Sequence, residues 1–493
     1  LETVREWLAR SEPLRLYTFA IEDLYRQQEH VLDEAGERLM SLSSRLASSS
    51  SDAYAALSTA DAHFRTITLS NGEQVTVSYG QYRAILATRR EQSDRAAAFA
   101  ALHEVYQASL NTYASLYNGV CQRDWFQARA RGYENTLQAA LHGDNIPTSV
   151  VENLIDTTRA GVEPLRRYHK LRRRALGVPS YHVYDFSIPI VTYDRKYRYD
   201  AVLDWIVEAV APLGPEYQAR MRKGFSGGWI DVYENEGKRS GAYSAPVYGT
   251  HPYMLLNYTD TLDDMFTLAH EMGHSMHTIL SHETQPFVYS SYTIFVAEVP
   301  STLSEALLLD YMLERSQDPV ERTVLLQHAI DNITSTFFTQ VMFADFELQA
   351  HRLAEEDKPI TSEILTDMYT NLLKDYYGNA VDLNDLTGVT WARIPHFFNS
   401  PYYVYQYATC FASAAKLANE ITSGDTSSRA RARERYLTLL RSGGNDHPME
   451  QLKKAGVDLS ASDTIRAIIE QLDGLVTRLE GELSSLSQSG AGS

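Results

Sequence analysis

The stretch TLAHEMGHSMHT, residues Thr267–Thr278, places three histidines within eight residues. The residues before it mix acids with apolar side chains, a pattern typical of an α-helix. Because four residues make a little more than one helical turn, His270 and His274 share a face and are close enough to bind one metal ion. Two histidines at this spacing, with a glutamate after the first, predict a metal site.

Glu271 and His277 differ from the two predicted ligands in their geometry. Glu271 is rotated by about 100° from His270, so it is a poor third ligand but can reach a water molecule on the metal. His277 shares the ligand face, but it lies roughly 10 Å from His270 along the helix axis. Since one ion cannot bind both, we expect His277 to be a neighbour in the cleft or a group that supports the ligands.

The third ligand must come from another segment, because a catalytic zinc has three protein ligands and one open position. The segment IFVAEVPSTLSEALLLDYMLER predicts a helix from Ser301 onward, with Pro300 in its first turn. Glu298 stands at this helix start among apolar residues, where an unpaired carboxylate is costly, so it is the candidate ligand. The alternative is an acid favoured by the helix dipole. Glu305, two turns further on the same face, is expected to hold a ligand histidine.

These motifs resemble the thimet oligopeptidase family of zinc metallopeptidases, and most closely its oligoendopeptidase F branch. HEMGHSMH and FVAEVPSTLSE carry the resemblance, together with GWIDVYENEGKRSGAYS, HPYMLLNYTDTLDDMFTLAHE and RIPHFFNSPYYVYQYATC. It spans roughly residues 55–480. It implies that His270, His274 and Glu298 bind one catalytic Zn²⁺ and that Glu271 is the catalytic acid and base.

The resemblance also implies an architecture. We expect a mainly α fold with two helical lobes that enclose a deep substrate channel, and a small β-sheet beside the zinc helix. The family extends further at its N-terminus, so this chain looks truncated there. We divide it into an N-terminal helical region of oligoendopeptidase F type (1–135), a catalytic zinc metallopeptidase domain (136–485) and a polar tail (486–493).

A cluster of aromatic residues lies in HFFNSPYYVYQYATC. Such clusters usually belong to the core, but each buried tyrosine hydroxyl needs a partner. In the family, a histidine and tyrosines of the matching segment face the zinc and donate hydrogen bonds to the substrate carbonyl. The resemblance therefore implies this role for His396 and for one tyrosine. Tyr405 is the first choice and Tyr402 the second, whereas Tyr403 and Tyr407 are expected to pack in the core.

Two short segments predict β-structure. HPYMLLNYT, residues 251–259, is rich in apolar and aromatic residues and predicts a strand shortly before the zinc helix. The resemblance implies that a peptide adds to the edge of this strand through main-chain hydrogen bonds. The preceding NEGKRSGAYS is expected to be a mobile loop. Asn71-Gly72 between two β-rich runs, 66–69 and 74–78, predicts a hairpin.

Composition restricts the class of protein. The net charge of −18 makes nucleic acid and anionic membranes poor partners. No stretch approaches 18 consecutive apolar residues, so no membrane span is expected. Cys121 and Cys410 are the only cysteines, which argues against a disulfide framework and favours a reducing compartment. With no signal-peptide pattern at Leu1, we expect a cytoplasmic protein.

The combined prediction is a zinc-dependent endopeptidase that hydrolyses internal bonds of short unstructured oligopeptides, with Glu271 as general base. One alternative is a dipeptidyl carboxypeptidase of the angiotensin-converting type, which also carries a His-Glu-Met-Gly-His motif. The segment AEVPSTLSE argues against it. A second alternative is a peptide-binding protein without catalysis, which the presence of all four core groups disfavours.

Overall fold

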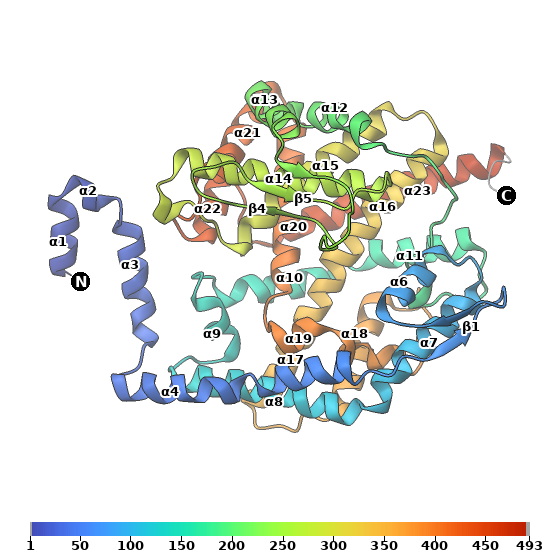
Figure 1. The fold of residues 1–493 in the computed structure, drawn as a ribbon, viewed down its shortest axis with the longest axis horizontal. Helices are drawn as coiled ribbons and strands as arrows, with labels where there is room; N and C mark the ends of the chain where they lie inside the picture. The colour runs from blue at the N-terminus through green and yellow to red at the C-terminus, as the bar shows by residue number, and fades with distance from the viewer. Residues whose placement is uncertain (1, 490–493) are drawn as a thin grey trace.

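Most of the chain is α-helical, and the β-structure is confined to two small sheets (Figure 1). The computed structural model describes residues 2–489. The prediction of a mainly α fold with a small β-sheet is therefore confirmed.

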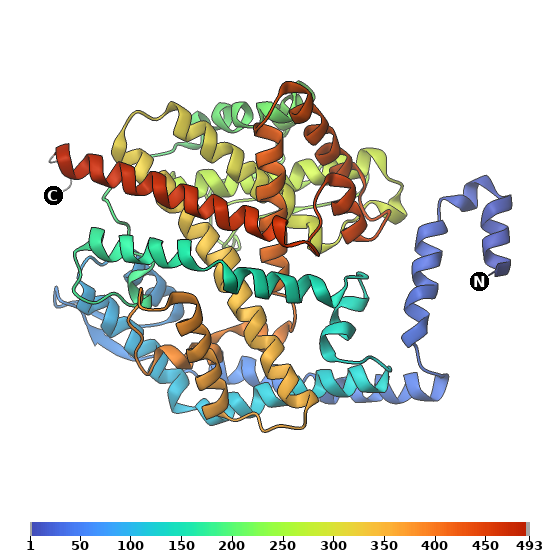
Figure 2. The same ribbon diagram turned by 180° about the vertical axis from the view of Figure 1, so that it is seen from behind.

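The first three helices lie at one side of the molecule, and α4 then runs along its edge towards α8 (Figures 1 and 2). Helix α3 contacts the rest of the chain, because Arg26 donates to His142 O at 2.7 Å and the ring of Phe19 lies 5.0 Å from that of His447. A fifth helix, α5, packs on α8. The bounds are α1 (Glu2–Arg10), α2 (Glu12–Arg15), α3 (Thr18–Gln27), α4 (Glu34–Ala47) and α5 (Ser49–Ala55).

The predicted hairpin is present. Strands β1 (Thr66–Thr68) and β2 (Gln74–Thr76) pair antiparallel around the Asn71-Gly72 turn, where Gly72 has a φ of 85°. A series of helices follows. They are α6 (Tyr79–Thr88), α7 (Gln92–Ala108), α8 (Leu110–Ala130), α9 (Thr136–His142), α10 (Thr148–Ala160) and α11 (Glu163–Leu176).

After an irregular connector the chain forms α12 (Tyr199–Ala209) and α13 (Pro215–Ser226) and then a three-stranded sheet. The strands are β3 (Ile230–Asp231), β4 (Tyr243–Ala245) and β5 (Tyr253–Leu255), in the order β3-β5-β4. The strand predicted from HPYMLLNYT is β5, and it pairs with a neighbour on both sides. Our expectation that a peptide adds to this strand is therefore wrong, because β5 has no free edge. The free edge nearest the metal-binding helix belongs to β4, within the segment that we expected to be a loop.

Helix α14 (Leu262–Thr284) carries the His-Glu-x-x-His motif. It begins with a capping box, in which Thr261 accepts from the backbone N–H of Asp264 and the Asp264 carboxylate accepts from the N–H of Thr261. Such a box satisfies two of the backbone donors that a helix start leaves free. The predicted helix is confirmed.

Helix α15 (Ile294–Arg315) packs along α14. Our prediction that it begins near Pro300 is wrong, because the helix starts two turns earlier and includes Pro300 in its interior. The two helices approach closely at Gly273: a Cβ atom there would lie 2.6 Å from Pro300 O and 2.6 Å from Ser301 Cα. Only glycine permits this contact.

The remaining helices complete the core around α14 and α15. They are α16 (Pro319–Ile333), α17 (Thr339–Glu355), α18 (Ser362–Tyr377), α19 (Pro395–Asn399), α20 (Tyr405–Thr422), α21 (Thr426–Arg441), α22 (Pro448–Ala455) and α23 (Ser462–Ser489). Helix α23 crosses the back of the molecule (Figure 2). The predicted polar tail is wrong for residues 486–489, which continue α23 with Leu486 buried. The rest of that tail lies outside the described residues.

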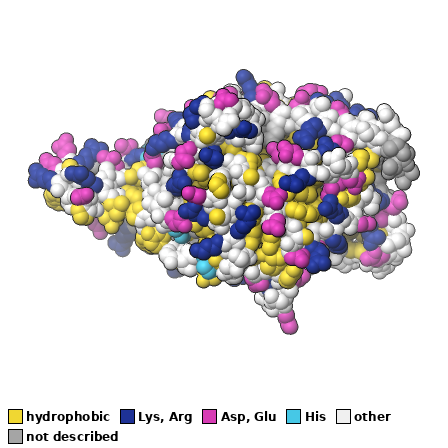
Figure 3. Space-filling model, turned by 90° about the horizontal axis from the view of Figure 1, so that it is seen from above, with side chains coloured by type: hydrophobic (Ala, Val, Ile, Leu, Met, Phe, Trp, Pro, Cys, Tyr) yellow, Lys and Arg dark blue, Asp and Glu magenta, His cyan; other side chains and the backbone are white. Residues whose placement is uncertain are grey.

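Basic and acidic side chains are interspersed on the face shown in Figure 3. Among the described helices, none combines the length and the apolar character needed to cross a membrane. Cys121 and Cys410 are both free and buried.

The close approach at Gly273 generates a prediction. Gly273→Ala should lower the free energy of unfolding by about 1–3 kcal/mol, because the added methyl group meets rigid backbone of α15. Chemical denaturation measures this change. Gly474→Ala in α23 is the matched control, since its Cβ meets nothing within 4 Å; alanine there should stabilise by up to about 1 kcal/mol. Equal stability of Gly273→Ala and wild type would contradict the tight contact.

Candidate active site

Three side chains from α14 and α15 converge on one point. The distance between His270 Nε2 and His274 Nε2 is 3.2 Å, and Glu298 Oε2 lies 3.2 Å from the first and 3.3 Å from the second. Two imidazole nitrogens and one carboxylate oxygen are a donor set that zinc accepts in catalytic sites. The three side chains together can therefore hold a metal ion.

Further side chains orient these three. Glu305 Oε1 lies 2.6 Å from His270 Nδ1, so this nitrogen donates to the carboxylate and Nε2 points into the site. The other oxygen of Glu305 accepts from Asn332 Nδ2 at 3.0 Å. Ser301 Oγ donates to Glu298 Oε2 at 3.0 Å. The position predicted for Glu305, beside a histidine of the motif, is the one observed.

The electrostatics favour an ionised Glu298. Burial acts to raise the pKa of this carboxyl, but its hydrogen bonds with His270 and His274 outweigh that effect and hold the pKa well below its usual range. An ionised carboxylate beside two imidazoles is ready to accept a cation.

Glu271 lies next to this group without being part of it. Its side chain is 7% exposed, and its Oε2 has no hydrogen-bond partner among the described residues. Burial raises the pKa of Glu271, whereas the imidazoles of His270 and His274 act to lower it. A buried carboxylate with a free oxygen and a raised pKa can accept a proton.

Two cavities meet at Glu271. The larger, of about 1290 Å³, is lined by His270, Glu271 and Glu305 and by residues of α6 and α16. The smaller, of about 510 Å³, is lined by β4 and by all three of the metal-binding side chains. His270 and Glu271 line both cavities. A substrate in either one therefore reaches the same carboxylate.

His277 is buried rather than in the cleft. It is 1% exposed, and its ring stacks on Tyr292 with a centroid distance of 3.5 Å. Its Nδ1 has no hydrogen-bond partner in the described part of the chain, and burial lowers its pKa to about 3. The expectation of a cleft neighbour is wrong, because His277 lies two turns further along the helix, where the ring of Tyr292 covers it. Tyr292 lines the smaller cavity, and the neutral ring of His277 packs behind it.

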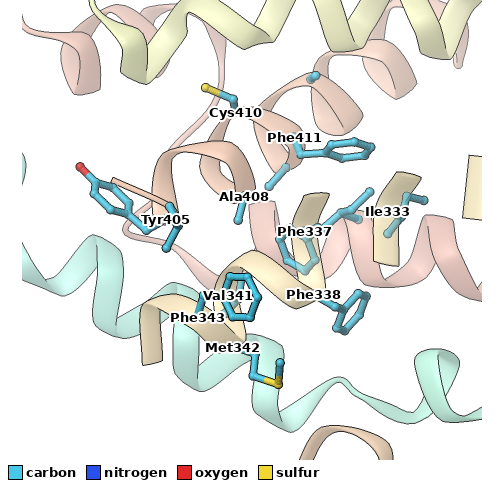
Figure 4. Close-up of a cluster of buried hydrophobic side chains, with 14 of the residues drawn as sticks. Ile333, Phe337, Phe338, Val341, Met342, Phe343, Tyr405, Ala408, Cys410 and Phe411 are labelled. Carbon is cyan, nitrogen blue, oxygen red and sulfur yellow. The ribbon is translucent and has the colours of Figure 1, made fainter. Parts of the chain in front are cut away.

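The two tyrosines chosen from the sequence line neither of the two cavities at Glu271. The Tyr402 hydroxyl lies 2.7 Å from Thr136 Oγ1 and is buried there. Tyr405 is 3% exposed and packs against Phe295. Figure 4 shows its ring at the border of a buried cluster, with the hydroxyl directed away from the other labelled side chains. Neither choice is supported by these positions.

The neighbouring pair, Tyr403 and Tyr407, lies beside His396 instead. The His396 ring is 6.0 Å from Tyr403 and 6.1 Å from Tyr407, and the two tyrosine rings are 5.3 Å apart. The carboxylate of Glu298 is among the groups that raise the pKa of Tyr407, after burial and Tyr403. Tyr407 of this cluster is therefore close enough to Glu298 to be affected by its charge. The four-residue spacing of 403 and 407 is the sequence signal that could have identified this cluster.

Two family models match successive parts of the chain. The family model for peptidase family M3 matches residues 85–470, and the model for oligopeptidase F matches residues 1–64. Our boundary at residue 135 stays a prediction, and the first of these two models begins well before it.

Several known proteins are similar over nearly the full chain. Oligopeptidase PepF of Bacillus subtilis is 36% identical over 99% of this chain and 72% of its own length. The crystal structure of oligoendopeptidase-F from Enterococcus faecium superposes with a TM-score of 0.81 at 32% identity, covering 98% of this chain and 81% of that one. A crystal structure from Chlamydophila abortus gives 0.90 at 36% identity, covering 96% and 78%. With its two histidines and glutamate gathered at one point, the chain belongs to peptidase family M3, a family of metallopeptidases.

Proposed function

We propose that the protein is a zinc-dependent endopeptidase that cleaves internal bonds of short unstructured oligopeptides. The observation that carries the proposal is the convergence of His270, His274 and Glu298, with the free carboxylate oxygen of Glu271 beside them in the same cavity wall. The relatives named oligopeptidase and oligoendopeptidase F support peptide substrates.

The proposed roles follow from these positions. A zinc ion held by the three ligands lowers the pKa of its water towards about 7 and polarises a carbonyl group. Glu271 takes a proton from the attacking water and then gives it to the amine that leaves. His396 and Tyr407 donate hydrogen bonds to the oxygen that becomes negatively charged in the transition state.

Strand β4 is the proposed binding edge for the peptide backbone. It pairs with β5 on one side, and its residues Tyr243 and Ser244 line the smaller cavity together with Glu271. A peptide that adds to this edge forms main-chain hydrogen bonds, which tolerate many side chains. Because a folded protein does not offer an extended segment, this mode favours short unstructured substrates.

The two alternatives make different products. A dipeptidyl carboxypeptidase releases dipeptides from the C-terminus, whereas an endopeptidase releases fragments of several lengths. A binding protein releases nothing. Incubation with a mixed peptide library, followed by mass spectrometry of the products with and without a chelator, separates all three.

The role of Glu271 can be tested directly. Glu271→Gln should keep about one zinc per chain, because this residue is not a ligand, but kcat should fall by roughly 10²–10⁴ through loss of the proton acceptor. Metal analysis and peptide hydrolysis measure the two effects. The matched control is Glu283→Gln on the same helix, whose carboxylate binds Arg220 at 2.8 Å. Activity of Glu271→Gln within tenfold of wild type would refute the proposed base.

The tyrosine assignment gives a second test. Tyr407→Phe should lower kcat by roughly 10²–10³ with little change in KM, because a hydrogen bond to the developing charge acts in the transition state. Tyr405→Phe should leave kcat nearly unchanged and alter stability by about 1 kcal/mol. If Tyr405→Phe loses turnover and Tyr407→Phe does not, the assignment of the hydrogen-bond donor to Tyr407 is wrong.

A further inference from the structure

Arg393 is a half-buried cation that has no anionic partner among the described residues. It ends the 3₁₀ helix Thr387–Arg393, and no ion pair or hydrogen bond of its guanidinium is found within residues 2–489. Its Nε is enclosed and unpartnered. The guanidinium carbon lies 5.3 Å above the ring of Tyr79, and Tyr82 and Tyr369 are also near. Aromatic rings compensate only part of the cost of burying a charge.

Two arginines that are more deeply buried, Arg95 and Arg172, show what is usual in this fold. Arg95 donates to the carboxylate of Asp185 at 2.7 Å and to two backbone carbonyls. Arg172 donates to the hydroxyls of Tyr168 and Tyr181 and to two carbonyls. Both have their donors satisfied. Arg393 thus differs from them in a chain that carries 63 acidic residues against 45 basic ones.

The unpaired guanidinium lines the larger cavity. Arg393 forms its wall together with Tyr79, Tyr82 and Arg83, and the same cavity reaches His270 and Glu271. A substrate that extends from Glu271 through this cavity therefore meets Arg393. The guanidinium fork matches a carboxylate, with which it can form two parallel hydrogen bonds.

The direction of strand β4 indicates which end of a peptide enters this cavity. β4 runs from Tyr243 to Ala245. Ala242, directly before the strand, lines both cavities, whereas Pro246, directly after it, lines only the smaller cavity. Antiparallel pairing is slightly more stable per residue than parallel pairing. A peptide antiparallel to β4 runs from the smaller cavity into the larger, so its C-terminal part lies on the Arg393 side.

We propose that Arg393 binds the C-terminal carboxylate of the peptide substrate. This inference rests on the proposed function and adds a determinant of substrate choice to it: the site prefers a peptide with a free C-terminus close to the cut bond. Arg83 lines the same cavity but is exposed to solvent, so its charge remains hydrated and discriminates less. The preference limits substrate length from the C-terminal side while leaving the cut bond internal.

The test compares one short unstructured peptide in two forms, with a free C-terminal carboxylate and with a C-terminal amide. Wild type should cleave the free acid with a kcat/KM about tenfold or more above that of the amide, mainly through KM, because a charge-assisted hydrogen bond is lost in the amide. In Arg393→Gln the ratio of kcat/KM for the free acid to kcat/KM for the amide should fall to about one. Arg393→Lys should give an intermediate ratio, because lysine keeps the positive charge but lacks the two parallel donors of the guanidinium group.

Two matched variants control for charge alone. Arg83→Gln should retain most of the ratio, and so should Arg198→Gln, which removes an exposed arginine that pairs with Asp200 at 3.0 Å. Equal cleavage of both peptides by wild type would overturn the proposal, as would an unchanged ratio in Arg393→Gln. The proposal would also be overturned if Arg83→Gln lost the preference for the free acid while Arg393→Gln kept it.

A third peptide identifies the source of the carboxylate. It has a C-terminal amide and a glutamate as its last residue. If it is cleaved as poorly as the plain amide, the α-carboxylate is the group that Arg393 binds; if it regains the preference, the bound group is a side-chain carboxylate and the assignment to the α-carboxylate is overturned.

Binding to the Glu271→Gln protein separates this inference from the proposed function. Calorimetric titration of the free-acid and amide peptides measures the same preference without turnover. Absence of hydrolysis by wild type would contradict the endopeptidase, while the two dissociation constants would still decide the role of Arg393. Equal dissociation constants would overturn the proposed carboxylate site.

Discussion

The close packing of α14 on α15 is the constraint on which the site depends. Two ligands lie on the first helix and one on the second, so the three meet only if the helix axes approach closely. Gly273 permits that approach, because its missing side chain leaves room for the backbone at Pro300 and Ser301. Since Gly273 lies directly before His274, the residue that brings the helices together is part of the motif itself.

A second interaction extends this packing to the aromatic cluster. Cys410 of α20 donates to Phe295 O of α15 with an Sγ–O distance of 3.0 Å. Glu298 lies three residues after Phe295, and Tyr407 lies three residues before Cys410. The same helix contact therefore brings Tyr407 towards the metal-binding group.

The parts of this arrangement that depend on local pattern could be predicted from the sequence. The four-residue spacing of His270 and His274 and the caps of α14 are properties of one helix. Glu305 follows Glu298 by two turns, and the observed contact with His270 agrees with that spacing. The start of α15 was missed because proline is usual in a first turn, whereas here Pro300 lies in the interior of the helix, with its carbonyl group at the close contact with α14.

Other features depend on distant parts of the chain. The order β3-β5-β4 is a non-local pairing, so no local pattern could show that β5 is central and β4 is the free edge. Tyr402 adopts a φ of 56°, a left-handed backbone conformation shortly before α20 that no local pattern predicts. The unpaired state of Arg393 is also a tertiary property, because only the folded chain shows which acids are absent around it.

The central claim is that Glu298 of α15 completes a metal site begun by two histidines of α14. The most direct measurement is the zinc content of wild type and Glu298→Ala after dialysis against zinc-free buffer, with circular dichroism as a check that both are folded. We expect about one zinc per chain in wild type and a small fraction of that in the variant, because two histidines alone bind zinc weakly. Stoichiometric zinc in folded Glu298→Ala would contradict the account, and would identify another residue as the third ligand.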